Sequence, residues 1–302
     1  MSSRPLTDLT VAILGLGQIG SSLGAALIQR RLVRRVVGTS RKPEVRRKAV
    51  EIRSVHEATD DPVAAAAAAD IVIPATPVRH LLRSIPGIVK AMKPGTLFLD
   101  VGSTKEEILR AALHAKPHHV NVVGGHPMAG TEKAGIDACD PDLFTNHPFI
   151  LIPGRILKKE AMNWAAALAQ GVGSHLVIMH RGADHDRGVA TISHLPYLIA
   201  YTLMHTAEEV SRRHPGPMWK RNLPIPWVLS LAGPSFRGAT RVARSDVDMV
   251  LDFLLTNRRE IPAIAAVFAR RLLHAAALVR KGNEKQLRKL LEEGRDVRGK
   301  MD

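Results

Sequence analysis

A glycine-rich turn near the N-terminus is the first segment whose residue types point to chemistry. Residues 15–20 read Gly-Leu-Gly-Gln-Ile-Gly, between a short apolar run at residues 11–14 and a helical pattern from Ile19 to Arg30. A Gly-x-Gly-x-x-Gly sequence between a strand and a helix is the fingerprint of a dinucleotide site. Its glycines allow a tight turn, close approach of the pyrophosphate and close helix packing. We therefore predict dinucleotide binding here; a glycine turn that binds nothing is the alternative.

The segment expected to meet the adenosine ribose carries cations instead of an acid. NAD-binding domains place Asp or Glu about twenty residues after the fingerprint, whereas this chain reads Thr39-Ser40-Arg41-Lys42. Hydroxyl and cationic side chains can bind and neutralise a 2′-phosphate. We therefore predict NADP in preference to NAD, with NAD possible. Ordinary surface cations are the alternative interpretation of Arg41 and Lys42.

A histidine lies in a second glycine-rich segment, after another apolar run. Residues 120–124 predict a buried strand, and residues 125–132 then read Gly-His-Pro-Met-Ala-Gly-Thr-Glu. In open α/β sheets, ligands bind outside the carboxyl ends of the strands. A histidine at that edge can take a proton as a general base. We predict this role for His126; a structural or solvated histidine is the alternative.

Two further turns are expected at the same edge of the sheet. Predicted strands at residues 71–73 and 96–101 are followed by the sequences Pro-Ala-Thr-Pro and Gly-Ser-Thr-Lys. Polar residues there are candidates for contact with cofactor or substrate, although each is also a common turn or capping residue. These candidates are Thr76, Ser103 and Lys105.

The second half of the chain holds another polar cluster. Residues 184–186 (Asp-His-Asp) and 193–197 (Ser-His-Leu-Pro-Tyr) are expected on one helix, with a kink because Pro196 removes a backbone donor. Arg237 and Arg241 are four residues apart, which would place them on one helical face. An arginine fork matches a carboxylate in two-point geometry, whereas exposure to solvent is the ordinary alternative.

The elements that must position these residues alternate as in an α/β domain. Short apolar runs predict a parallel sheet with crossover helices, and the last strand is expected at residues 175–179. After that strand, apolar residues recur only at helical spacing, as at residues 261–279. We therefore predict a Rossmann-type α/β nucleotide-binding domain at residues 1–180, followed by an all-α helical domain at residues 181–302.

Composition restricts the class of protein. The chain has 302 residues, 45% of them hydrophobic and 24% charged, which is typical of a globular protein. The single cysteine excludes an internal disulfide, no Cys/His cluster suggests a metal, and no export signal is evident, so a cytoplasmic location is expected. No segment is expected to span a membrane, because proline and charged residues such as Arg270 and Arg271 interrupt the best apolar runs.

The net charge of +15 favours anionic ligands. Nucleic acid is the less favoured partner, because single-strand binders stack bases on aromatic side chains. Aromatic residues make up only 4% of this chain, and the basic stretches at residues 30–53 and 270–298 contain none. We therefore predict a small-molecule substrate and no nucleic acid.

Taken together, these segments resemble the prephenate and arogenate dehydrogenase family of tyrosine biosynthesis over nearly the whole chain. The glycine fingerprint alone indicates only a dinucleotide, whereas the histidine loop and the Ser-His-Leu-Pro sequence are far more specific. The resemblance rests on residues 15–20, 100–105, 124–132, 143–144, 185–186, 193–196 and 236–241. It implies a nucleotide domain followed by a helical dimerisation domain, and therefore a homodimer.

The resemblance also implies a reaction and a role for each site residue. Family members remove a hydride from a cyclohexadienol and release carbon dioxide, which leaves an aromatic phenol, and no metal is required. His126 would be the general base toward the ring hydroxyl, Ser103 would bond the same oxygen, and Arg241 would anchor a carboxylate. The other residues expected to line the substrate pocket are Thr131, Glu132, Ser193, His194 and Tyr197. Those expected to bind the cofactor are Gly15, Gly17, Gln18, Ile19, Gly20, Thr39, Ser40, Arg41, Thr76 and Pro77.

Two positions depart from the family pattern and bear on the substrate. Tyr197 stands where many members have a second histidine, and Gly238 stands where they have an aspartate. Tyrosine can donate a hydrogen bond but carries no positive charge near neutral pH. The sequence shows no extra acid to meet the ammonium group of arogenate, so prephenate is slightly favoured.

Two other functions are compatible with the pattern. A β-hydroxyacid dehydrogenase would have the same two-domain layout, but such enzymes use a lysine of the helical domain, and residues 184–201 contain none. A protein that senses nucleotides or binds nucleic acid, and has lost turnover, is the other alternative.

Overall fold

The computed structural model describes residues 4–115, 120–131, 133–155, 157–214 and 225–301. Its first part is a single sheet of eight strands in the order β3-β2-β1-β4-β5-β6-β7-β8. This is the Rossmann order with two additional strands at one edge. The strands are β1 (Thr10–Leu14), β2 (Arg35–Thr39), β3 (Glu57–Thr59), β4 (Ile71–Pro74), β5 (Leu97–Asp100), β6 (Asn121–Pro127), β7 (Pro148–Pro153) and β8 (His175–Ile178).

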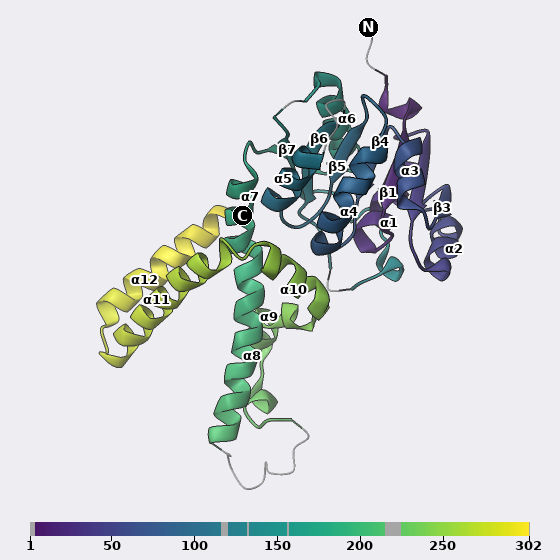
Figure 1. The fold of residues 1–302 in the computed structure, drawn as a ribbon. Coiled ribbons are helices and arrows are strands. Elements are labelled where there is room, and N and C mark those ends of the chain that lie inside the picture. The colour runs from purple at the N-terminus through teal and green to yellow at the C-terminus, as the bar shows by residue number, and fades with distance from the viewer. Residues whose placement is uncertain (1–3, 116–119, 132, 156, 215–224, 302) are drawn as a thin grey trace.

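Helices cover both faces of the sheet (Figure 1). One hydrophobic core lies between the sheet and helices α1, α2 and α6, and a second lies between the sheet and helices α3, α4 and α5. Adjacent residues of β1 alternate between the two cores, as the pleat of a strand requires. The helices are α1 (Gln18–Gln29), α2 (Pro43–Glu51), α3 (Pro62–Ala68), α4 (Val78–Ala91), α5 (Glu106–Ala115) and α6 (Lys159–Gly171).

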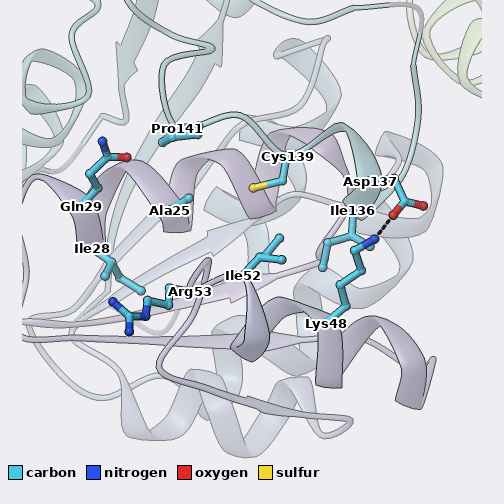
Figure 2. Close-up of a pocket in the computed structure, with 10 residues that line it drawn as sticks. All are labelled: Ala25, Ile28, Gln29, Lys48, Ile52, Arg53, Ile136, Asp137, Cys139 and Pro141. Carbon is cyan, nitrogen blue, oxygen red and sulfur yellow. Dashed lines mark hydrogen bonds and ion pairs between the residues drawn. The ribbon is translucent and has the colours of Figure 1, made fainter.

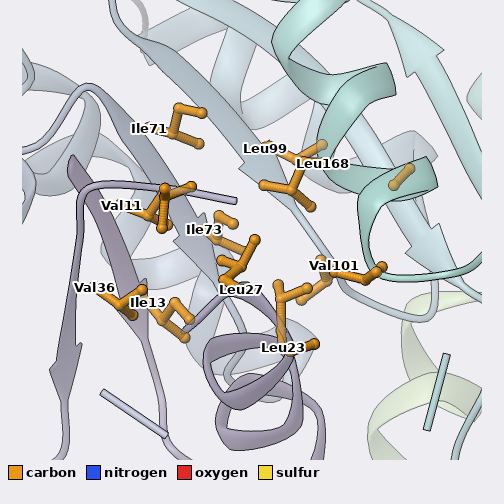
Figure 3. Packing of buried hydrophobic residues seen from close by; sticks show 14 of the residues in the cluster. Val11, Ile13, Leu23, Leu27, Val36, Ile71, Ile73, Leu99, Val101 and Leu168 are labelled. Atoms are coloured by element: carbon orange, nitrogen blue, oxygen red, sulfur yellow. The ribbon is translucent and has the colours of Figure 1, made fainter. Parts of the chain in front are cut away.

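The first of these cores shows why the strands read as continuous apolar runs. Val11 and Ile13 of β1 and Ile71 and Ile73 of β4 are fully buried against Leu23 and Leu27 of α1 (Figure 3). Because helices cover both faces, polar residues are excluded along most of each central strand. Most polar residues that remain in the strands lie near strand ends, and Thr39, Asp100 and His126 are at or near the carboxyl ends.

The structure confirms the predicted fold class and differs from the sequence-based interpretation in two places. The first is β3, whose three residues form an edge strand without an apolar run, preceded by the largely polar helix α2. The second is β7, which pairs antiparallel with β6 although the other strand pairs are parallel. The reason is that an apolar run buried on both faces carries no signal of strand direction.

The second part of the chain is helical. Figure 1 shows α8 and the paired α11 and α12 extending away from the sheet, with α9 and α10 beside α8. The predicted boundary at residue 180 falls between β8 and α7. The helices are α7 (Gly182–Val189), α8 (Leu195–Arg213), α9 (Pro234–Ala239), α10 (Val247–Thr256), α11 (Ile261–Arg280) and α12 (Glu284–Arg298).

Helix α11 corrects the expectation that no segment meets the criteria for a membrane span. Within the described residues it is the one helix long and apolar enough to cross a bilayer, with a mean hydropathy of 1.5. One such helix is weak evidence, and Arg270 and Arg271 lie at its centre. Most of the helix is exposed in the single chain.

Candidate active site

Two of the three fingerprint glycines occupy positions that admit no Cβ, and the third borders open space. Gly15 has φ of 113°, and a Cβ there would lie 2.8 Å from the Ala75 carbonyl oxygen. A Cβ on Gly20 would overlap the Gly15 carbonyl oxygen, so this glycine lets α1 pack against the turn. A Cβ on Gly17 would meet nothing within 4 Å. That open space, at a helix N-terminus without a side-chain cap, is where a pyrophosphate would lie.

The fingerprint is joined directly to the histidine loop. The Gln18 side chain donates to Thr131 Oγ1 at 2.6 Å, and its carbonyl oxygen accepts from the Thr131 backbone N–H at 3.0 Å. Ile19, the next residue, packs against the core beneath. A predicted cofactor residue and a predicted substrate residue therefore contact each other, which brings the two half-sites to one edge of the sheet.

The end of β2 forms the expected cationic segment. Thr39 is buried at the last position of the strand, Ser40 follows it, and Arg41 is exposed. The sequence interpretation missed Arg46 of α2, whose guanidinium donates to the backbone carbonyls of Ser40 at 2.8 Å and of Arg41 at 3.1 Å. These bonds fix the backbone of the segment, since a side chain one helical turn into α2 can reach back to the loop. The only sequence feature that could have indicated this role for Arg46 is its position five residues after Arg41, in the same basic stretch.

The turns after β4 and β5 lie at the same carboxyl edge, but their polar residues have different environments. Thr76 precedes Pro77, the N-cap of α4, and its methyl group lies 2.8 Å from where a Gly15 Cβ would be. Ser103 is half-buried in the next turn. Lys105 was a candidate for ligand contact, and that interpretation is wrong, because its side chain is fully buried.

Lys105 instead holds the histidine loop in place from below. Its ammonium pairs with the buried Asp100 carboxylate and donates to the Gly125 carbonyl oxygen at 2.6 Å, one residue before His126. Burial raises the pKa of Asp100 and lowers the pKa of Lys105, and the attraction between the two opposes both shifts. Removing either partner would leave a buried uncompensated charge.

His126 contacts a polar pair from the second domain. Its Nδ1 lies 2.8 Å from Nε2 of His185, and Nδ1 of His185 lies 2.8 Å from Oδ1 of Asp186. Burial is the main cause that holds the pKa of His126 well below its usual value, with His185 and Lys105 adding to it. Burial also lowers the pKa of His185, which the Asp186 carboxylate partly opposes. Both imidazoles are therefore neutral near pH 7.

His194 lies next to this cluster on a π-helical turn, Ala190–His194, that joins α7 to α8. This irregular turn precedes Pro196, so the expected break in the helix occurs as a π turn. Asn257 Nδ2 donates to the Asp186 carbonyl oxygen at 2.7 Å and lies 3.1 Å from His194 Nδ1. Burial lowers the pKa of His194 to about 4, so this ring is also neutral.

Aromatic packing fixes the remaining side chains of α8. His194 stacks on Phe253 with ring centroids 4.5 Å apart, and Tyr197 meets the same ring edge-on at 5.1 Å. Ser193 is half-buried beside them. The sequence interpretation missed Phe253 and Asn257, because an apolar and a polar residue near the end of an amphipathic helix carry no signal of a site.

Two aspartates of the helical domain cap helices of the nucleotide domain. Asp186 accepts from the backbone N–H groups of Lys105 at 2.7 Å and Glu106 at 2.9 Å, at the start of α5. Asp252 of α10 accepts from the N–H groups of Val78 and Arg79 at the start of α4. A carboxylate at a helix N-terminus satisfies unpaired donors and favours the helix dipole. The two domains are therefore joined at the edge of the sheet where the site lies.

The structure places the predicted arginines differently from the sequence interpretation. Arg237 lies on α9, which ends at Ala239, and Arg241 begins a separate 3₁₀ turn, Arg241–Arg244, so the two do not share a helical face. The short helix ends because the backbone of Thr240 departs from helical geometry. Arg241 is exposed, and its turn packs on α8 through a hydrogen bond from Tyr201 to Ser245. Glu132 lies outside the described residues.

A separate hollow of about 550 Å³ lies between α1, α2 and residues 136–141 (Figure 2). Apolar side chains such as Ile28, Ile52 and Ile136 form much of its wall, and Lys48 pairs with Asp137 at one side. None of the predicted site residues lines it. Across the described part of the chain, no three His, Cys, Asp or Glu side chains gather as metal ligands.

Comparison with known proteins matches both parts of the chain. Residues 23–178 match the model of the prephenate dehydrogenase nucleotide-binding domain, and residues 181–293 match that of the prephenate dehydrogenase dimerization domain. Prephenate dehydrogenase of Bacillus subtilis is 32% identical over 83% of this chain and 65% of the relative. Cyclohexadienyl dehydrogenase of Zymomonas mobilis is 31% identical over 82% of this chain and 80% of the relative.

Solved structures give the same result. Prephenate dehydrogenase of Aquifex aeolicus, in complex with hydroxyphenyl propionate and NAD⁺, superposes with a TM-score of 0.86 and 25% identity, over 99% of this chain and all of that one. Arogenate dehydrogenase of Synechocystis superposes with a TM-score of 0.79 and 27% identity, over 97% of this chain and all of that one.

Proposed function

Since this chain belongs to the prephenate and arogenate dehydrogenase family of oxidoreductases, we propose that it oxidatively decarboxylates prephenate to 4-hydroxyphenylpyruvate with NADP. The observation that carries the proposal is the link between Gln18 and Thr131. It joins the dinucleotide turn to the loop of a neutral, half-buried histidine, so the hydride acceptor and the proton acceptor would face one substrate.

The chemistry requires little from the protein beyond placement. When bound, the nicotinamide accepts the hydride, and loss of carbon dioxide leaves an aromatic ring, which drives the reaction. His126 takes the proton of the ring hydroxyl, and Ser103 hydrogen-bonds the same oxygen. Arg241 holds a carboxylate, while Thr131, Ser193, His194 and Tyr197 line the pocket. Holding these groups in the reactive arrangement raises the rate, because an oriented pair reacts without the entropy cost of an encounter.

His194 supports substrate binding through a fixed donor. The Asp186 carbonyl oxygen can only accept, so it faces the side-chain nitrogen of Asn257. The second hydrogen on that nitrogen is donated to His194 Nδ1. A neutral His194 then carries its proton on Nε2. That N–H is suited to a carboxylate or carbonyl oxygen, both of which prephenate has.

The choice of prephenate over arogenate rests on the lack of an extra acidic residue in the sequence to meet the ammonium group of arogenate. Tyr197 is compatible with that choice. Its hydroxyl can bond the carbonyl of a pyruvyl side chain, and arogenate differs there by an ammonium group. We propose prephenate as the preferred substrate, a homodimer as the assembly and the cytoplasm as the location. The match to a dimerization domain supports the dimer.

One assay tests the activity. Reduction of the cofactor, followed at the nicotinamide absorbance, is compared for prephenate, arogenate and a panel of β-hydroxyacids. We expect the highest kcat/KM with prephenate. A higher value with arogenate would reverse the substrate assignment, and turnover of hydroxyacids alone would overturn the proposal.

Cofactor preference has its own test at the end of β2. We expect kcat/KM to be higher with NADP than with NAD, because Ser40 and Arg41 can bond a 2′-phosphate. Arg41→Ala is expected to lower kcat/KM with NADP about tenfold or more, the value of a charge-assisted hydrogen bond, and to leave NAD unaffected. Arg47→Ala, in the same basic segment, is the matched control. A wild-type preference for NAD would refute the assignment.

A further inference from the structure

Three side chains form a continuous hydrogen-bonded chain that begins in one domain and ends in the other. His126 Nδ1 lies 2.8 Å from His185 Nε2, and His185 Nδ1 lies 2.8 Å from Asp186 Oδ1. The two imidazole rings are tilted by 60° with centroids 5.0 Å apart, so they meet through their nitrogens rather than by stacking. His126 is half-buried, whereas His185 and Asp186 are buried.

The hydrogen bond between His185 and Asp186 can have only one donor. An ionised carboxylate accepts hydrogen bonds and donates none. Asp186 also accepts from two backbone N–H groups at the start of α5, so both of its oxygens act as acceptors there. The proton between Asp186 and His185 therefore belongs to His185 Nδ1.

The tautomer of His185 in turn determines which nitrogen of His126 carries a proton. A neutral imidazole with its proton on Nδ1 offers a lone pair on Nε2. The lone pair of His185 Nε2 points at His126 Nδ1, which must then carry the proton of the second bond. In neutral His126 the remaining lone pair lies on Nε2, the nitrogen on the other side of the ring.

We propose that His185 and Asp186 are positioning residues that hold His126 in the tautomer with its proton on Nδ1, and so keep Nε2 ready to accept the substrate proton. This inference rests on the proposed role of His126 as the base. When His126 takes the proton, its positive charge is hydrogen-bonded through His185 to the Asp186 carboxylate. The tautomer and the charge are thus set by the helical domain, although the base belongs to the nucleotide domain.

Close packing between the two domains holds the hydrogen bonds of His126, His185 and Asp186 in place. Gly182 begins α7 one turn before Asp186, and a Cβ there would lie 3.0 Å from the Glu106 backbone nitrogen. Helix α7 therefore sits directly on the start of α5. Asp186 has two functions at once, because it caps α5 and orients His185.

Other charged and titratable groups face the same cluster. Lys105 reaches it from the β5–α5 turn, where it pairs with Asp100, and His194 reaches it from the π turn. Lys105 opposes a positive charge on His126. Asp186 is the one acidic group hydrogen-bonded to the imidazoles within the described residues, so it is the group to alter.

Asp186→Asn tests the direction of the chain. The Asn side-chain nitrogen can take the place of Oδ1 and donate to His185 Nδ1, with loss of the bond from the Lys105 backbone N–H. This places the His185 proton on Nε2 and, in turn, the His126 proton on Nε2. Long-range ¹H–¹⁵N correlation spectra of ¹⁵N-histidine-labelled protein distinguish protonated from unprotonated ring nitrogens, and His126→Gln identifies the His126 signals. We expect an unprotonated Nε2 in the wild type and a protonated Nε2 in Asp186→Asn.

Kinetics provide the second readout. Asp186→Asn is expected to lower kcat at least about 100-fold, as expected when a base is held in the wrong tautomer. His185→Phe removes the acceptor and is expected to lose a similar factor. His185→Gln can place its side-chain oxygen near the lost Nε2, and we expect it to recover at least about tenfold over His185→Phe with little change in KM.

Two controls separate orientation from structure. Asp252→Asn weakens the equivalent cap on α4 without touching a histidine, so we expect the His126 spectrum to remain that of the wild type. Asp184→Asn removes an exposed carboxylate from the same helix as Asp186, and we expect unchanged kcat. A loss of the wild-type tautomer in Asp252→Asn would show that a weakened helix cap between the domains is enough to change the His126 tautomer. It would overturn the proposed relay from Asp186 through His185 to His126.

Failure of the relay, in which Asp186 and His185 set the tautomer of His126, and failure of the proposed function give different results. A wild-type enzyme that turns over prephenate with its His126 proton on Nε2 overturns the relay and leaves the function standing. The expected spectra without turnover of any cyclohexadienol support the relay and overturn the function.

Discussion

His126 combines three properties that a general base needs. It lies at the carboxyl edge of the sheet, its loop is tied to the dinucleotide turn through Thr131, and it is neutral at rest. The lowered pKa makes it a weaker base in the free protein, but it also keeps the proton-accepting form predominant near pH 7. The carboxylates of a bound substrate would stabilise the protonated ring when it is needed.

His126→Gln separates catalysis from cofactor binding. We expect kcat to fall at least about 100-fold, the lower end for loss of a general base, with unchanged affinity for NADP because the residue lies outside the glycine turn. Steady-state kinetics and cofactor titration measure the two quantities. His175→Gln, an exposed histidine on β8, is the control, and unchanged turnover in His126→Gln would remove this residue from the mechanism.

The pH dependence of kcat/KM tests the environment of His126. The pH dependence of kcat/KM reports the pKa values of groups in the free enzyme. Because burial holds the pKa of His126 below 6.5, kcat/KM is expected to stay level as pH falls to 6.5. It should decline only at lower pH, when the base becomes protonated. The profile is measured at saturating NADP. An acid limb centred at or above pH 6.5 would contradict a lowered pKa for His126.

At the scale of elements, the turn between β1 and α1 shows how backbone geometry creates a binding site. Gly15 and Gly20 are needed by the protein itself, since both approach its own backbone. A Cβ on Gly17 would meet nothing in the protein within 4 Å, and we propose that this glycine is needed only for the ligand. The same motif therefore contains residues with different physical purposes.

Gly17→Ala and Gly20→Ala form a matched pair that tests this distinction. Gly17→Ala is expected to leave the free energy of unfolding within about 0.5 kcal/mol of the wild type and to weaken NADP binding at least tenfold. Gly20→Ala is expected to destabilise the protein by about 1–3 kcal/mol, as overpacking does. Urea denaturation and cofactor titration measure both. Equal loss of stability in the two variants would refute the assignment.

At the scale of the whole molecule, the helical domain presents apolar surface that the single chain does not bury. Leu272, Leu273 and Val279 of α11 and Leu291 and Val297 of α12 are all more than half exposed. An apolar surface of this kind marks an interface. A second copy of the chain would cover it, which also accounts for the membrane-like hydropathy of α11.

Leu273→Asp tests the proposed homodimer. A buried unpaired carboxylate costs about 3 kcal/mol, so the dissociation constant is expected to rise roughly 100-fold. Sedimentation velocity at several concentrations measures the shift toward monomer. Val63→Asp, an exposed apolar residue on α3 of the nucleotide domain, is the control and should leave the assembly unchanged. A wild-type monomer at all concentrations would contradict the homodimer.

The sequence by itself determined the local features of this protein. It predicted the glycine turn, the buried strands, the change to helices near residue 180 and the histidine at the sheet edge, because each depends on neighbouring residues or on spacing along one element. Only the tertiary structure showed that His185 and Asp186 adjoin His126, that Lys105 is buried, and that Asn257 and Phe253 support His194. The His126–His185 and His194–Asn257 contacts join residues 59 and 63 positions apart, and the backbone of Lys105 bonds Asp186, 81 positions away. No local pattern records which surfaces will meet when the two domains pack.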